Sequence, residues 1–299
     1  MLPYHQMIQD YTNLEGRDLW EYELNFSPEE VRRVLYHLLE LEGSTVDYYF
    51  LDDNCSFMIL KALEIGRPGL RLFEADETFV IPLDTLKRAR ALISSSRYRP
   101  SLQTEWRQRR DQLSPTSQKQ VADLNAEASS EKVHALESAA LDAATFRIAL
   151  KSFENRETWK NLNYELQKER ALRGPQAPSF AIRKPEISPE ESPDSSSIEV
   201  GFSEFDENQA AMFGIRAAFR DQLSSNVGVP PFSHLEVLSF QWRMPTTSSW
   251  IPWRYRLLDS LSTQAVDRFE SPLSWGVSVG GQSRDASSMQ NEALGRLGY

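Results

Sequence analysis

The only cysteine of the chain, Cys55, stands in the segment Asp52-Asp53-Asn54-Cys55, directly before a run of apolar residues with helical spacing. Asp and Asn are preferred at helix N-caps, so Asp53 or Asn54 should cap a helix that begins at Cys55. The unpaired amides of a helix start carry partial positive charge, which stabilises a thiolate and prepares it for nucleophilic attack. Cys55 is therefore the candidate nucleophile, with Asn54 and Asp53 beside it. The competing interpretation is a small buried core residue, which is the usual role of a lone cysteine.

The elements before this segment should hold it in place. Residues 19–26 alternate apolar and polar side chains, which predicts a half-buried strand. Ser27, Pro28 and Glu30 then supply an N-cap, a first-turn proline and a capping box for a helix that Gly43 closes. Its apolar stripe should consist of Val31, Val34, Leu35, Leu38, Leu39 and Leu41. The opposite, solvated face should carry Arg32, Arg33, His37 and Glu40.

The residues around Cys55 predict a unit of strand, tight turn and helix. Residues 46–51 are β-branched or aromatic for the most part and favour a strand. The helix that follows should bury Phe57, Leu60 and Leu63 and end before residues 67–69, which include a proline and a glycine. Another helix should run from Pro82 to about Ile93.

The middle of the chain changes in composition. Residues 101–173 are charged, rich in Gln and Ala, and periodic, which predicts a helical hairpin of two or three amphipathic helices. The basic run from Arg107 to Arg110 is flanked by Glu105 and Asp111, so a solvated helix face is favoured there over an anion site. Residues 174–197 contain five prolines together with many Ser and Glu, which predicts a linker or surface loop.

The last hundred residues predict an antiparallel β-region. Residues 198–299 form short alternating stretches separated by Gly, Pro, Ser and Asn, which is typical of a meander. The expected strands are 198–202, 212–219, 234–242, 253–258 and 274–279, and residues 293–299 should end without a closing element. Helices and antiparallel strands in separate parts of the chain predict an α+β fold.

Composition excludes several classes of function. The 33 Lys and Arg against 43 Asp and Glu give a formal net charge of −10, which opposes binding to nucleic acid. One cysteine excludes an internal disulfide, and the histidines lack the spacing of a helical metal motif, so neither a metal nor a cofactor is expected. No run approaches the roughly 18 apolar residues that span a bilayer, and the first residues lack a signal peptide.

Ordered motifs run through the first hundred residues. They are Glu15–Tyr22, Ser27–Glu30, Asp47–Phe50, Asp53–Ser56, Arg67-Pro68, Ile81–Thr85 and Arg97–Ser101. In this order they resemble the Lnb N-terminal periplasmic domain family. Residues 1–100 would correspond to the C-terminal half of that cysteine domain. Farther on, Phe213–Phe219 and Ser271–Trp275 resemble pieces of the β-rich region that follows the domain in longer relatives.

This resemblance implies an envelope protein in the periplasm or at the outer membrane. It implies a partial, circularly permuted papain-like fold of the NlpC-like or lecithin retinol acyltransferase-like kind. It also implies lipoprotein N-acylation, in which Cys55 takes an acyl chain from a phospholipid or diacyl lipoprotein as a thioester and passes it to an amine. The family's histidine lies on an upstream strand that would precede Met1, and none of His5, His37, His134 and His234 matches it. We therefore expect an incomplete or inactive member, without its general base.

Two other functions stay open at this point. A cysteine peptidase or amidase of the NlpC-like superfamily would use the same thiol and fold. A non-catalytic structural protein associated with the outer membrane would use residues 198–299 instead, as an incomplete barrel-like domain, and would keep Cys55 without a catalytic role.

Overall fold

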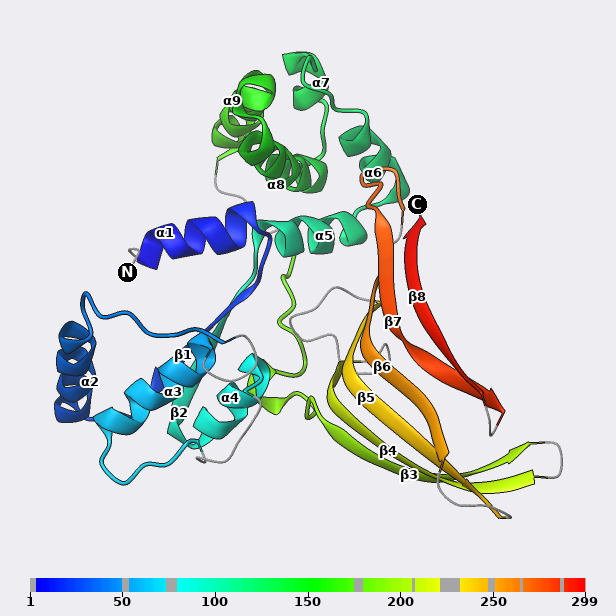
Figure 1. Cartoon of the computed structure of the whole chain (residues 1–299). Helices are drawn as coiled ribbons and strands as arrows, with labels where there is room; N and C mark the ends of the chain where they lie inside the picture. Colours follow the sequence, from blue (N-terminus) through cyan, green and yellow to red (C-terminus); the bar gives the residue numbers. More distant parts are fainter. Residues whose placement is uncertain are drawn as a thin grey trace. The chain divides into compact units, whose positions relative to one another are not determined.

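The computed structural model describes residues 4–49, 54–73, 80–174, 180–205, 208–220, 232–246, 251–263, 266–285 and 288–298. It shows a mixed α+β fold, as predicted, divided into two compact units (Figure 1). One unit comprises Met1–Glu23 and Ser94–Glu186, and the other comprises Leu24–Ile93 and Ile187–Tyr299. Within the described residues, no helix combines the length and the apolar character that a membrane crossing requires.

The first unit is mainly helical. Its elements are α1 (Tyr4–Ile8), the π-helix η1 (Gln9–Leu14), α5 (Leu102–Gln112), α6 (Pro115–Ala122), α7 (Ser130–His134), α8 (Ser138–Glu154) and α9 (Arg156–Arg173). Strand β1 (Leu19–Leu24) pairs with β2 (Ile93–Arg99) in a two-stranded sheet. Helices α8 and α9 form the predicted hairpin around Asn155, but residues 101–173 hold five helices rather than two or three. Capping residues such as Ser114 and Ser129 start new helices where periodicity alone suggested a continuous one.

The helices of this unit enclose a conventional apolar core. Its most buried members are Trp106, Val121, Val133, Ile148, Leu162 and Leu166. The prediction of a solvated basic face at residues 107–110 was wrong for Arg109. Its guanidinium is largely buried, contacts Glu105 at 2.7 Å and Asp142 of α8 at 3.2 Å, and lies 3.8 Å from the centroid of the Phe146 ring. Arg109 therefore ties α5 to α8.

The second unit begins with α2 (Pro28–Glu40), α3 (Cys55–Gly66), α4 (Pro82–Arg88) and the 3₁₀ helix η2 (Ala89–Leu92). The capping box of Ser27 and Glu30 forms as predicted. Buried Leu60, Leu72, Ala89 and Leu92 make a small core. Gly66 of α3 lies so close to α2 that a Cβ atom there would come within 2.6 Å of the Val34 side chain.

Two predictions in this region were wrong. No residue of α2 is buried: Val31, Leu35 and Leu39 of the predicted stripe are exposed, whereas Arg33, expected on the solvated face, donates to the carbonyl oxygen of Gly66 at 3.0 Å. Within the predicted stripe, Val34 is the residue that Gly66 of α3 approaches. Residues 46–49 form no strand, and residues 50 and 51 lie outside the described part. A strand needs a hydrogen-bonded neighbour, and β1 pairs with β2 rather than with this segment.

The rest of the second unit is a six-stranded antiparallel meander. Its strands are β3 (Ser197–Phe205), β4 (Asn208–Arg220), β5 (Ser233–Pro245), β6 (Ile251–Ser262), β7 (Ser274–Asp285) and β8 (Ser288–Gly298), paired in chain order (Figure 1). The five predicted strands are present, each longer than expected. The expectation that residues 293–299 lack a closing element was wrong, because β8 pairs with β7 over most of its length. Pairing overrides the weak strand preference of its two glycines, Gly295 and Gly298.

The proline-rich segment before β3 is held against α4. It contains the 3₁₀ helix η3 (Pro189–Glu191), and Ser188, Ser192 and Ser195 within it are buried. Lys87 of α4 lies 2.8 Å from Asp84 and 3.0 Å from Asp194, and it donates to the carbonyl oxygen of Pro193 at 2.8 Å. This end of the predicted linker is therefore anchored rather than solvated.

Candidate functional site

The start of α3 positions the predicted nucleophile. Cys55 is the first residue of α3, and its side chain is exposed. Asn54 is the N-cap: its Oδ1 accepts hydrogen bonds from the backbone N–H groups of Ser56 at 3.0 Å and Phe57 at 3.3 Å. The prediction that an Asp or Asn caps the helix at Cys55 is confirmed for Asn54. Asp53 lies outside the described residues.

A second hydrogen bond of the same side chain fixes the helix start. The Nδ2 of Asn54 donates to the carbonyl oxygen of Val80 at 2.6 Å, and Asn54 is almost completely buried. Little water can compete for these bonds, so losing them would leave buried polar groups unpaired. Asn54 thus joins the first turn of α3 to the residues that lead into α4, and Cys55 has a defined position as a result.

The loop after α3 is packed against the helix by charge and aromatic contacts. Glu64 accepts hydrogen bonds from the backbone N–H groups of Leu72 at 2.6 Å and Phe73 at 3.0 Å. Burial opposes ionisation of Glu64, but these bonds and the nearby Lys61 ammonium outweigh it and lower the pKa of the carboxyl group. Phe57 and Phe73 meet edge to face, with 4.8 Å between ring centroids. These contacts hold residues 72 and 73 against the helix that begins at Cys55.

The chemistry available at this point is that of an exposed thiol on a helix start. Among the described residues, none hydrogen-bonds to the Sγ of Cys55. The Asn54 cap engages the amides of Ser56 and Phe57, so these two groups do not stabilise a developing oxyanion. The amide of Cys55 itself is not engaged by this cap. The described side chains thus provide a nucleophile without a hydrogen-bonded base.

The histidines have neighbours of their own. His37 of α2 lies 4.0 Å from Glu40, and His134 of α7 lies 3.1 Å from Glu169. His5 is exposed on α1. His234 is on β5 and lines a cavity of about 440 Å³ on the sheet. None of these contacts includes Cys55.

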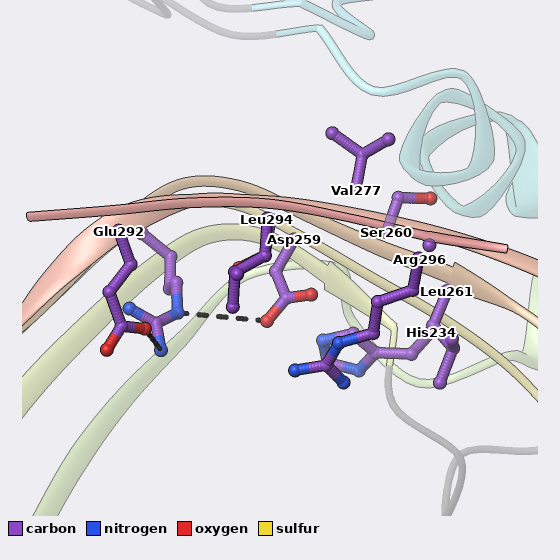
Figure 2. Close-up of a pocket in the computed structure, with 11 residues that line it drawn as sticks. His234, Asp259, Ser260, Leu261, Val277, Glu292, Leu294 and Arg296 are labelled. Carbon is purple, nitrogen blue, oxygen red and sulfur yellow. Dashed lines mark ion pairs between the residues drawn. The ribbon is translucent and has the colours of Figure 1, made fainter.

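The cavity on the sheet was not found by sequence reasoning. Figure 2 shows Asp259, Glu292, Arg296 and His234 on one side of the sheet and Val277 on the other. The cavity is lined by polar and charged side chains from β5 to β8, together with several small and apolar ones. The alternation of charged with apolar residues along these strands was the signal that could have located it, since residues two apart on a strand share a face.

Three side chains beside this cavity have the types that bind metals. The ligand atoms of His234, Glu236 and Asp259 lie within 4.8 Å of one another. Both carboxylates, however, have guanidinium partners: Arg254 lies 3.0 Å from Glu236, and Arg256 lies 3.7 Å from Asp259. A cation would have to compete with two positive charges, so we assign no metal to the group. The two carboxylates of this group belong to a row of ion pairs along one face of the sheet.

Two regions of the chain match known families. Residues 1–91 match the Lnb N-terminal periplasmic domain family, and residues 186–299 match a domain of unknown function (DUF7840). No curated protein and no solved structure matches the chain. The first match includes Asn54 and Cys55, and the second includes the whole six-stranded sheet. Residues 1–91 are therefore similar to the Lnb N-terminal periplasmic domain family, and this match suggests a location in the cell envelope.

Proposed function

We propose that Cys55 is the nucleophile of a thiol-dependent acyl transfer in the cell envelope. The observation that carries this proposal is the exposed thiol on the first residue of α3, held by the buried Asn54 cap within the family-matched region. The resemblance to lipoprotein N-acyltransferases supplies the substrates, namely a phospholipid or diacyl lipoprotein as donor and an amine as acceptor. The proposal includes a partial, circularly permuted papain-like fold for the domain that carries Cys55, as the resemblance implies.

The reaction has two steps. In the first, the Sγ of Cys55 attacks an ester carbonyl of the donor, the C–O bond breaks, and the alcohol leaves with the proton of the thiol. In the second, the amine attacks the thioester, the C–S bond breaks, and the thiol is regenerated with the amine's proton. A positioned base contributes on the order of 10²- to 10⁴-fold in such steps, so the described residues alone support slow turnover at most.

A non-catalytic envelope protein is the second candidate. The absence of a hydrogen bond to the Cys55 Sγ among the described residues favours it. In that case the start of α3 is a structural cap, and Cys55 is a neutral surface position.

Acyl trapping separates the two candidates. The protein is incubated with phospholipid that carries an alkyne-tagged acyl chain, and the adduct is mapped by mass spectrometry. We expect a label on Cys55 that neutral hydroxylamine removes and that Cys55→Ser abolishes. A hydroxylamine-resistant label, or one that persists in Cys55→Ser, contradicts acyl transfer through this thiol. No label on the wild-type protein favours the non-catalytic role.

The cap provides a test that does not need the substrate. Asn54→Ala removes the side-chain hydrogen bonds to Ser56, Phe57 and Val80 and should destabilise the protein by about 1–3 kcal/mol in urea unfolding. It should also change the rate at which iodoacetamide alkylates Cys55, because the first turn of α3 loses its support. Asn155→Ala, which removes the cap of α9, is the matched control and should leave the alkylation rate unchanged. Equal alkylation in both variants would mean that Asn54 does not position the thiol.

A further inference from the structure

The two faces of the six-stranded sheet differ in chemistry. Register places Glu236, Asp259 and Ser278 side by side in one row across three strands. The adjacent row, on the opposite face, contains Val237, Leu258, Val279 and Ala293. Figure 2 shows Val277 and Ser260 on one side of the sheet, and Asp259 and Glu292 on the other, together with Leu261 and Leu294. One face therefore carries the ion pairs of the sheet, and the other is mainly apolar.

Burial on these faces is the reverse of the usual pattern. Glu236 is 3% exposed and Ser239 is 2% exposed, whereas Val200 is 81% exposed and Phe202 is 93% exposed. The other exposed apolar residues of the apolar face are Ile198, Ile215, Leu235, Phe240, Met244, Leu258, Trp275, Val277, Val279, Met289 and Leu297. Antiparallel sheets with one wet face normally place polar residues toward water. A continuous apolar surface of this extent marks an interaction site.

The polar face carries ion pairs between its own side chains. Glu199 pairs with Arg216 at 2.5 Å, and Glu236 pairs with Arg254 at 3.0 Å. Arg256 lies between Asp259 at 3.7 Å and Glu292 at 4.0 Å. Several charges of this face are thus paired with one another, whereas many apolar side chains of the opposite face are exposed. Because the apolar face offers few hydrogen-bonding side chains, the surface that covers it should itself be apolar.

We propose that the apolar face of the sheet β3–β8 lies against the hydrocarbon of a lipid bilayer. Strands β4 and β5 have 13 residues each, which at about 3.3 Å per residue reach across a hydrocarbon layer of roughly 30 Å. Charged residues of this face, Glu204 and Arg220, stand at the ends of β3 and β4. Tryptophans on the face also stand near strand ends, with Trp275 at the start of β7 and Trp242 near the end of β5. Indole rings favour the boundary between hydrocarbon and head groups.

The net charge helps to choose among membrane components. A formal charge of −10 opposes attraction to anionic head groups, so the contact should depend on the hydrocarbon and occur with zwitterionic lipid. The envelope location of the family makes a bilayer available to the protein. This inference is independent of acyl transfer at Cys55.

Quenching by brominated lipid tests the contact directly. The full chain is reconstituted with phosphatidylcholine vesicles whose acyl chains carry bromine, which quenches tryptophan only at close range. We expect quenching that falls in Trp275→Phe and Trp242→Phe, because both rings are on the apolar face. The buried Trp106 of the helical unit should contribute none. Cys55→Ser should be quenched like the wild-type protein, which separates this test from that of the proposed function.

Two neighbouring substitutions provide the matched control. Val200→Glu adds a negative charge to the apolar face, and Gly201→Glu adds the same charge to the opposite face, where a Cβ atom meets nothing within 4 Å. Val200→Glu should weaken vesicle binding roughly tenfold or more, and Gly201→Glu should not. Circular dichroism checks that both variants fold. Equal effects of the two variants, or no quenching of the wild-type protein, would overturn the proposal. So would a lipid-free dimer that Val200→Glu dissociates, since the occupant would then be a second copy of the chain.

Discussion

The helical hairpin buries its large apolar side chains, whereas the six-stranded sheet exposes many of its own. In the hairpin, Ile148 and Leu166 are completely buried, and the charged side chains lie at the edge of that core. In the sheet, Glu236 and Ser239 are buried, and Val200 and Phe202 are among the most exposed residues. Both regions divide their side chains between two faces, with a period of about 3.6 residues in the helices and 2 in the strands. What differs is the medium that each outer surface fits: water for the helices, and hydrocarbon for the sheet.

This difference has an energetic meaning. Burying an aliphatic or aromatic side chain contributes about 1.5–3 kcal/mol, so the hairpin gains its stability in water. The apolar face of the sheet gains nothing from its exposed residues until another apolar phase covers them. Stability of the sheet in water must therefore come from backbone pairing and from the ion pairs of its polar face.

The largest expected effect comes from truncating the same kind of side chain in each region. Leu166→Ala should lower the free energy of unfolding by about 2–5 kcal/mol, because it leaves a cavity in a closed core. Val200→Ala should change it by no more than about 0.5 kcal/mol in water. Urea unfolding followed by far-ultraviolet circular dichroism measures both. A large loss of unfolding free energy for Val200→Ala in water would contradict this difference between the two regions, because it would mean that the apolar face is already covered.

An intermediate effect is expected from the buried charges of the sheet. Glu236→Leu leaves the partly exposed guanidinium of Arg254 without its carboxylate and should destabilise the protein by about 1–3 kcal/mol. Arg254→Met should have a similar cost. The double variant should recover more than half of the summed loss, since replacing both partners leaves no unpaired charge. Losses that simply add in urea unfolding would show that the pair does not stabilise the polar face.

The helix caps and the strand positions could be predicted from the sequence because they depend on residues close together in the chain. Ser27, Glu30 and Asn54 act on backbone groups within three residues, so their caps depend on neighbours in the chain and can be read from it. The strand positions of the sheet follow from alternation in the same way. The second role of Asn54, the hydrogen bond to Val80, spans 26 residues and has no local signal.

The predictions that were wrong concern features that depend on residues far away in the sequence. Helix α2 meets α3 at Val34, which Gly66 approaches closely, while Leu35 and Leu39 of the same apolar stripe are exposed. Residues 46–49 have strand propensity without a pairing strand, whereas β8 has little propensity and pairs fully with β7. The cavity beside His234 required the register of four strands. Periodicity finds elements, but which face is covered depends on what the rest of the molecule places against it.

The smallest expected effect is the pH dependence of stability that comes from Glu169, a carboxylate at the edge of the helical core. Glu169 of α9 accepts a hydrogen bond from Arg173 at 2.7 Å and contacts His134 at 3.1 Å, and these partners lower the pKa of its carboxyl group below the ordinary value of 4.5. Because the folded-state pKa is depressed, this contribution to stability is fully present above that ordinary value and is lost as the pH falls through the lowered one. Glu169→Gln should therefore shift the urea midpoint most near neutral pH, and the difference from the wild-type protein should shrink as the pH falls below the ordinary value of 4.5.

The matching substitution in the sheet is Glu236→Gln, where the carboxylate lies inside the polar face instead of at a core edge. Measuring both variants by urea unfolding over the same pH range compares the two settings of a carboxylate directly. A Glu169→Gln difference that stays constant with pH would mean that the carboxylate charge does not hold α7 to α9, and that shape alone closes the helical core.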